Sequence, residues 1–274
     1  MFTQTSRQLL LQKLFWNPWG AAIVHRLIAF ERKFDTVVRN YSLMGDTNGE
    51  RWLLTLMDEE PVVFDVGFHD GASTAKILEV RPKAKVTGFD PSRFARQCYE
   101  RDFTKDGRVA FENVGLSSES GELVFHDYEN MCNSFAPRKE MPGETPTTYR
   151  TPIATLDAYA EERGIEHVNF MKIDAEGFDL NVLEGGRRLL GNQCVDIFMF
   201  EFASGWSASK RYLWEAHEYF EPLPYKLYHL FNGFLCPLVY DVRIDSCCTL
   251  SAMYVGVSDR RLARGDIPLR EYRF

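Results

Sequence analysis

The sequence predicts an α/β fold with a doubly wound, mostly parallel sheet of seven strands, and three observations favour it. Short apolar runs alternate with helical stretches through most of the chain. The first run, at residues 62–66, is apolar and rich in β-branched residues, as is typical of a strand buried on both faces. Alternation of strands with helices predicts parallel pairing through the first five strands. The last two runs lack an intervening helix, which predicts a terminal hairpin with one antiparallel strand.

The elements are expected in the following order. Strands are predicted at 62–66, 85–89, 109–113, 168–173, 194–201, 225–230 and 251–257. Helices are predicted at 6–16, 20–38, 48–57, 72–80, 91–101, 155–162, 178–188 and 208–219. Residues 1–57 are expected to form an N-terminal helical extension, and residues 58–274 the main domain. The polar segment 118–150, with a β-hairpin at its start, is expected to be an insertion or lid over a pocket mouth.

The first strand and the turn after it form the most informative segment, VVFDVGFHDGAST at residues 62–74. An apolar run contains Asp65 near its end, and Gly67 and Gly71 then frame a turn that leads into a helix. Ligands of open α/β sheets bind outside the carboxyl ends of the strands, and glycine lets the backbone approach them closely. The next strand ends in a second carboxylate, Asp90, which is suited to the two hydroxyls of a ribose.

The glycine spacing indicates which nucleotide-like ligand fits. A dinucleotide fold uses G-x-G-x-x-G, because the pyrophosphate lies on bare backbone. This chain has D-x-G-x-x-x-G, and Asp65 and Asp70 would repel a pyrophosphate. S-adenosylmethionine (SAM), which carries a sulfonium and an ammonium but no phosphate, suits this turn better. Two plainer roles stay open: Asp65 as a cap of the turn, and Asp90 as a helix cap followed by Pro91 at the first helical position.

A segment later in the chain resembles a known family. Residues 168–186 read VNFMKIDAEGFDLNVLEGG and resemble the signature segment of the FkbM-type, SAM-dependent methyltransferases. Residues 113–125, with NVGLS followed by SGELVF, are similar to a hairpin of that family. Asn133-Ser134-Phe135 and residues 151–157 stand where the family has a serine-bearing loop and an entry from a strand into a helix. The resemblance covers about residues 60–203, and His69 stands where the family more often has asparagine.

The resemblance implies a class I methyltransferase, Rossmann-like fold with strand order 3-2-1-4-5-7-6. It implies SAM as cofactor and O-methyl transfer to a hydroxyl of a sugar, glycan or glycosylated small molecule. The alternatives are a non-catalytic SAM-binding protein and an N- or carboxyl-directed methyltransferase of a non-sugar molecule. The expected cofactor-binding residues are Asp65, Gly67, His69, Gly71, Thr74, Asp90, Pro91, Asn113 and Val114.

Three carboxylates are the candidates for the chemistry, because a hydroxyl is a weak acid and needs a base beside it. Asp174 and Glu176 follow the fourth strand, and Glu201 ends the fifth. The plainer reading pairs Asp174 with Lys172 and makes Glu176 an acid at a helix start. By analogy with methyltransferases of related architecture, Asp174 and Glu201 are also candidate ligands of Mg²⁺.

The composition narrows the partners. The net charge of −7 argues against a nucleic acid, and the six cysteines show no C-x-x-C spacing, so we expect a cytoplasmic protein with reduced thiols. No apolar window reaches the length of a membrane span. The N-terminal stretch is expected to pack on the domain or on a second subunit, giving a homo-oligomer, or to make peripheral membrane contact.

Nine aromatic residues after the fifth strand are candidates for stacking on sugar rings or for core packing: Trp206, Tyr212, Trp214, Tyr219, Phe220, Tyr225, Tyr228, Phe231 and Phe234.

Overall fold

The computed structural model describes residues 22–23, 26–27, 48–128, 132–138, 143, 145–245 and 251–271. The chain divides into two compact units, residues 1–41 and residues 42–274. The predicted helix at 6–16 and most of the one at 20–38 lie outside the described residues. Within the part of the chain that is described, no helix is long and apolar enough to cross a membrane.

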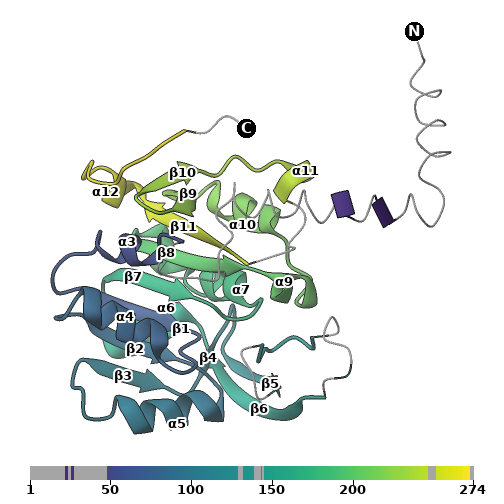
Figure 1. Ribbon diagram of the computed structural model, residues 1–274. Coiled ribbons are helices and arrows are strands. Elements are labelled where there is room, and N and C mark those ends of the chain that lie inside the picture. Colours follow the sequence, from purple (N-terminus) through teal and green to yellow (C-terminus); the bar gives the residue numbers. More distant parts are fainter. Residues whose placement is uncertain are drawn as a thin grey trace. The chain divides into compact units, whose positions relative to one another are not determined.

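The second unit is built on one large, mostly parallel sheet (Figure 1). Its strands, from edge to edge, are β10 (Phe234–Pro237), β9 (Tyr225–Phe231), β11 (Ala252–Ser258), β8 (Val195–Phe202), β7 (Val168–Ile173), β1 (Val62–Val66), β2 (Lys85–Phe89) and β3 (Val109–Glu112). The pairs from β3 to β8 are parallel, and β11 runs antiparallel to both β8 and β9. The predicted order 3-2-1-4-5-7-6 is therefore confirmed, and the unpredicted β10 adds an eighth strand beyond β9.

Both faces of this sheet are covered, as strand alternation requires. On one face, Val63, Phe170 and Ile197 belong to a core cluster with Leu53 of α3 (Glu50–Leu54) and Ile77 of α4 (Ala72–Val80). On the other face, Phe64 packs edge-on to Tyr159 of α6 (Leu156–Arg163), and Phe198 stacks on Phe220 of α10 (Leu213–Phe220). Helices on both faces define a doubly wound sheet, whose carboxyl strand ends remain open to a ligand.

The remaining helices are short. They are α5 (Arg93–Asp102), α7 (Asp179–Glu184), α8 (Arg187–Gly191), α9 (Ser204–Ala208), α11 (Val242–Asp245) and α12 (Asp259–Leu262). The predicted helix at 178–188 is wrong in its continuity, because it breaks at Gly185, where a Cβ would overlap the backbone oxygen of Ser117. The predicted helix at 208–219 begins later, at Leu213, since Lys210 has a left-handed φ of 60°.

The insertion between β3 and α6 forms a separate small sheet with the order β4-β6-β5 (Figure 1). Its strands are β4 (Gly115–Leu116), β5 (Gly121–Asp127) and β6 (Thr147–Ala154). The predicted hairpin between the first two strands is wrong, because β6 lies between β4 and β5 and pairs with both. The antiparallel ladder between β5 and β6 runs from the pair Gly121–Ile153 to the pair Asp127–Thr147 and so holds the two ends of the insertion together.

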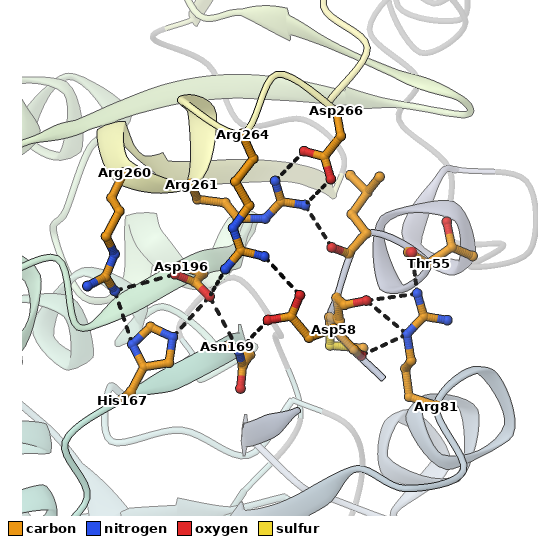
Figure 2. A network of polar contacts seen from close by, with 12 residues as sticks. Thr55, Asp58, Arg81, His167, Asn169, Asp196, Arg260, Arg261, Arg264 and Asp266 are labelled. Atoms are coloured by element: carbon orange, nitrogen blue, oxygen red, sulfur yellow. Dashed lines mark hydrogen bonds and ion pairs between the residues drawn. The ribbon is translucent and has the colours of Figure 1, made fainter. Parts of the chain in front are cut away.

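A polar network ties the amino ends of β7 and β8 to the last helix (Figure 2). The buried carboxylate of Asp196 lies 3.0 Å from His167 Nε2, 3.5 Å from Arg260 and 3.7 Å from Arg264. Arg264 also pairs with Asp58, in the loop after α3, at 2.8 Å. The network therefore fastens α12 and the start of the domain to the end of the sheet opposite the open one.

Candidate active site

A cavity of about 430 Å³ lies at the carboxyl ends of the central strands. Its size falls within the usual range for small-molecule sites. Residues from β1, β2, β7 and β8 line it on the sheet side, and the insertion contributes Leu116, Phe125 and residues 132–135. Eight residues predicted to form the site lie in this lining: Gly67, His69, Asp90, Pro91, Val114, Asp174, Glu176 and Glu201.

The turn after β1 depends on glycine and on a left-handed backbone. Gly67 has a φ of 83°, and a Cβ there would overlap the backbone oxygen of Asp174 on the neighbouring strand. Gly71 has a φ of 80° and begins α4, where a Cβ would meet the ring of Phe103. His69 between them is left-handed too, at 49°. Glycine is therefore required at both positions by close packing within the protein and by the left-handed backbone.

Asp90 joins this turn to the end of β2. One carboxylate oxygen accepts from the backbone N–H of His69 at 2.8 Å, and the other from that of Ser92 at 2.8 Å. Burial raises the pKa of Asp90 against the opposing effect of these hydrogen bonds. The alternative role as helix cap is wrong, since the Ser92 hydroxyl caps α5 by accepting from Ala95 N, and Pro91 precedes that cap. Each carboxylate oxygen of Asp90 keeps a lone pair for a ligand hydroxyl.

Four residues predicted to contact the cofactor lie outside the lining: Asp65, Gly71, Thr74 and Asn113. Asp65 and Thr74 are fully buried, and the Thr74 hydroxyl donates to Asp65 at 2.7 Å. The Asn113 amide donates to the backbone oxygens of Asp90, at 2.8 Å, and Ser92, at 3.2 Å. Their contacts stabilise the walls of the cavity, and direct contact with a cofactor stays a prediction for them.

Burial also gives Asp65 an unusual proton affinity. It raises the pKa of this carboxyl to about 6, although Lys172 and the Thr74 hydroxyl lower it. Among the described residues, no group donates to the second oxygen of Asp65. A buried carboxyl with one unpaired oxygen is expected to bind a proton readily.

The three predicted catalytic carboxylates come together. One oxygen each of Asp174, Glu176 and Glu201 lie within 4.8 Å of one another. Asp174 directly follows β7, Glu201 is the penultimate residue of β8, and these strands are parallel neighbours. Glu176 turns towards them from a left-handed backbone, with a φ of 49°. We refer to these three residues as the carboxylate cluster.

Each carboxylate of the cluster has its own protein donor. Lys172 Nζ lies 3.1 Å from Asp174, which confirms the pairing that the plainer reading proposed. Arg138 of the insertion pairs with Glu176 at 2.6 Å, and the Ser251 hydroxyl donates to Glu201.

These pairings set the charge within the cluster. Burial lowers the pKa of Lys172, but the carboxylates of Asp174 and Asp65 outweigh it and raise the pKa overall. Burial and the charge of Asp174 raise the pKa of Glu176 to about 7, against the effect of Arg138. The same two causes raise the pKa of Glu201 well above its usual range, against the hydrogen bond from Ser251. The cluster therefore holds exchangeable protons near neutral pH.

Glu176 does not start a helix, contrary to the plainer reading of this residue. Helix α7 begins at Asp179, whose carboxylate accepts from Gly177 N at 3.1 Å and from Ala175 N at 3.3 Å. Burial raises the pKa of Asp179 to about 7, with a further contribution from Asp174. Asp179 thus closes the loop below, and this leaves Glu176 free to face the cavity.

The donor set of the cluster is compatible with Mg²⁺ only in type. Carboxylate oxygens are the ligands that Mg²⁺ prefers. Arg138, Lys172 and Ser251 already donate to these carboxylates, however, and the two cations offset part of their charge without a metal ion. We therefore derive no step through a metal.

The aromatic candidates for sugar stacking do not line the cavity. Trp206, Phe220 and Tyr225 are buried in the core, and Tyr212 and Trp214 are exposed. Core packing therefore explains the buried members. The aromatic side chains that do line the cavity are Phe68, Phe89, Phe125 and Phe135.

Sequence reasoning missed Arg138 and Ser251. Arg138 lies in a polar insertion, where an arginine normally signals only a solvated surface, and its partner Glu176 is 38 residues away. Ser251 precedes the last strand and reaches Glu201 across 50 residues. Neither residue carries a local sequence signal, because only the tertiary fold brings it to the cluster.

Comparison with known proteins assigns the chain to a family. The family profile of the methyltransferase FkbM domain matches residues 65–205, just over half of the chain. The 2-O-methyltransferase NoeI of Sinorhizobium fredii is 26% identical over 155 residues, which are 51% of this chain and 63% of that protein. The chain thus spans less than two thirds of NoeI.

Two further proteins are similar to this chain. The hexuronic acid methyltransferase AglP of Haloferax volcanii is 30% identical over 173 residues, or 62% of this chain and 68% of that protein. A solved rRNA methylase from Streptococcus thermophilus is similar with a TM-score of 0.41 and 15% identity, over 76% of this chain and 93% of that one. On the match to its domain profile, the chain belongs to the FkbM methyltransferase family.

Proposed function

We propose that this protein is a SAM-dependent O-methyltransferase that methylates a hydroxyl of a sugar, glycan or glycosylated small molecule. The carboxylate cluster in the cavity carries the proposal, because it places a base with a near-neutral pKa where an acceptor hydroxyl would bind. Membership of the family supports methyl transfer. The names of the two relatives, a 2-O-methyltransferase and a hexuronic acid methyltransferase, support a sugar acceptor.

The cavity suits SAM in its chemistry, and its volume lies in the range of small-molecule sites. Asp90 offers oxygen acceptors for ribose hydroxyls, and Gly67 lies in the lining of the cavity. The carboxylates around the turn and the cluster suit the cationic groups of SAM. When bound, SAM supplies an activated methyl group on its sulfonium.

The chain's own residues then have two tasks, to position the acceptor and to accept its proton. We assign the base to Glu176, because a carboxylate with a pKa of about 7 is both ionised and basic at neutral pH. Asp174 holds the opposite side of the cluster through its ion pair with Lys172. Glu201 is the third carboxylate of the cluster and accepts a hydrogen bond from the Ser251 hydroxyl.

The proposal is tested in two steps with the full chain. Calorimetry should detect SAM binding, and incubation with neutral sugars, uronic acids and glycans should then yield S-adenosylhomocysteine and a methylated product. Binding without turnover on any acceptor would favour the non-catalytic alternative. No binding would overturn the proposal altogether.

The name of the relative AglP, a hexuronic acid methyltransferase, makes methyl transfer to a carboxylate a second candidate reaction. Mild alkali distinguishes the two products, because it hydrolyses a methyl ester and leaves a methyl ether intact. We expect the methyl group to survive this treatment. Amine-bearing acceptors in the same panel test N-methylation.

Metal dependence is tested by chelation. Because Arg138, Lys172 and Ser251 already donate to the three carboxylates of the cluster, we expect turnover to persist in excess EDTA. Loss of turnover that added Mg²⁺ restores would instead assign the cluster to a metal ion.

We also propose a cytoplasmic, homo-oligomeric protein whose acceptor is not a nucleic acid. The acidic net charge supports the last point, and Cys98, Cys194 and Cys236, which form no disulfide, are compatible with a reducing compartment. Light scattering tests the oligomeric state. Liposome flotation with and without residues 1–55 tests peripheral membrane contact, and loss of binding on truncation would support it.

A further inference from the structure

The insertion reaches the carboxylate cluster through one buried arginine. The side chain of Arg138 is 4% exposed, and its two terminal nitrogens donate to Glu176 at 2.6 Å and to Ser204 at 3.0 Å. Ser204 begins α9, directly after β8. One guanidinium thus joins the insertion, the loop after β7 and the segment after β8.

The same insertion holds the backbone of Glu176. The Ser134 hydroxyl donates to the backbone oxygen of Glu176 at 2.8 Å, and Phe135 packs against Phe178 with ring centres 5.2 Å apart. Ser134 is itself bound to β5 by reciprocal backbone hydrogen bonds with His126, at 2.8 and 3.1 Å. Both ends of Glu176, carboxylate and main chain, are therefore held by residues 134–138.

Glu176 needs this support because its backbone is left-handed. Such a conformation is unfavourable for a non-glycine residue and persists only where the surroundings impose it. Nearby carboxylates also repel it, since Asp174 and Glu201 lie within the same cluster. Without a fixed cation, Glu176 would relax away from both.

We propose that Arg138 is a positioning residue of the active site, which holds the Glu176 carboxylate in the cluster and makes that geometry depend on the insertion being docked. The proposal rests on the proposed methyl transfer and deepens it. The insertion is, on this view, a structural part of the catalytic centre. Its docking assembles the base at the acceptor side of the cavity.

The first test compares Arg138→Gln and Arg138→Lys with a control in the same insertion, Arg150→Gln. Arg150 pairs with Glu122 at 3.0 Å on the exposed surface and contacts no residue of the cluster. We expect Arg138→Gln to lower kcat about 10²-fold, as a misplaced catalytic group does, with the affinity for SAM unchanged. Lysine keeps the charge but cannot serve Glu176 and Ser204 together, so an intermediate kcat is expected.

A double-mutant cycle with Glu176→Gln separates positioning from general stabilisation. Because Arg138 acts through Glu176, replacing Arg138 in the Glu176→Gln background should change kcat little. Additive losses, or a loss of SAM affinity as large as the loss of kcat, would overturn the proposal. If Arg138→Gln fails to fold, the lysine variant carries the same cycle.

Hydrogen exchange gives a readout that needs no turnover. The amides of Ser134 and Ala136 donate to His126 O and to the Ser134 hydroxyl, so they should exchange faster in Arg138→Gln and not in Arg150→Gln. Unchanged exchange would overturn the docking role. A wild-type protein that turns over no acceptor would overturn the proposed function instead, and the two failures are thus distinguishable.

Discussion

Glu176 shows how much of the site depends on single residues. Its left-handed backbone and its ion pair with Arg138 place its carboxyl group beside Asp174. Its raised pKa makes this carboxyl group ionise near neutral pH. Sequence reasoning found the three carboxylates, because acids after neighbouring parallel strands meet at one edge of the sheet. It did not find Arg138, whose role follows from a contact between segments far apart in the chain.

The first prediction concerns the pH dependence of turnover. A base is active when ionised, so kcat/KM should rise tenfold per pH unit below about 7 and level off above it. In Glu176→Gln, kcat should fall by about 10²–10⁴-fold, and this inflection should disappear. A pH profile that keeps its inflection in the variant would move the base to Asp174 or Glu201.

The second prediction concerns Asp90. Asp90→Ala should weaken SAM binding by about 1–3 kcal/mol, because two ligand hydroxyls would lose a charged acceptor. Calorimetry measures the affinity directly, and Asp90→Asn, which keeps one acceptor oxygen, should lose less. If the affinity is unchanged, Asp90 only supports the backbone of His69 and Ser92.

The third prediction uses the buried carboxyl of Asp65. Its pKa is about 6 in the folded state, against 3.8 for a free aspartate side chain. Between pH 3.8 and about 6, the Asp65 carboxyl is protonated in the folded state and ionised in the unfolded state. Its contribution to the free energy of unfolding is therefore fully present below about pH 4 and is lost as the pH rises to about 6. Asp65→Asn should gain roughly 3 kcal/mol relative to wild type across this range.

Urea unfolding at several pH values measures this difference. Asp102→Asn is the control of opposite sign, because the hydrogen bond from Arg101 lowers the pKa of that exposed carboxyl. Relative to wild type, it should become less stable as the pH rises. A constant difference between Asp65→Asn and wild type would contradict the raised pKa of Asp65.

At the scale of elements, the central strands follow closely from the sequence. The predicted bounds of β1, β2 and β7 agree with the structure, because apolar runs that must be buried on both faces leave little freedom. The failures lie where tertiary contacts decide. Helix α7 ends early because Gly185 packs against Ser117, and β6, which contains Pro152, pairs with strands on both of its sides.

The fourth prediction tests an element junction, the network around Asp196. Asp196→Ala would leave His167, Arg260 and Arg264 without their shared carboxylate, at a cost of about 1–3 kcal/mol of unfolding free energy. Chemical denaturation measures this cost. Arg96→Gln, which removes an exposed pair with Glu100, should cost less than about 1 kcal/mol. If both variants lost the same free energy of unfolding, the Asp196 network would stabilise the fold no more than an exposed ion pair does.

At the scale of the whole molecule, the sheet separates two kinds of polar site. The carboxyl ends of β7 and β8 carry the cluster, and their amino ends carry the Asp196 network. We therefore expect Asp196→Ala to leave the affinity for SAM unchanged, a result that the same calorimetric assay checks. The fold class was predictable at this scale from the alternation of strands and helices, whereas the strand order followed from the resemblance to the FkbM-type methyltransferases.

The network at the amino ends also includes contacts that can form only late in synthesis. Arg264 reaches Asp58 across 206 positions of the chain, and Arg261 reaches the backbone of Leu56 across 205. A ribosome delivers β1, β7 and β8 well before α12, and the entropy of closing so long a loop is small only once the intervening chain has folded. The contacts of Arg261 with Leu56 and of Arg264 with Asp58 can therefore form only after the strands that hold the carboxylate cluster have been synthesised.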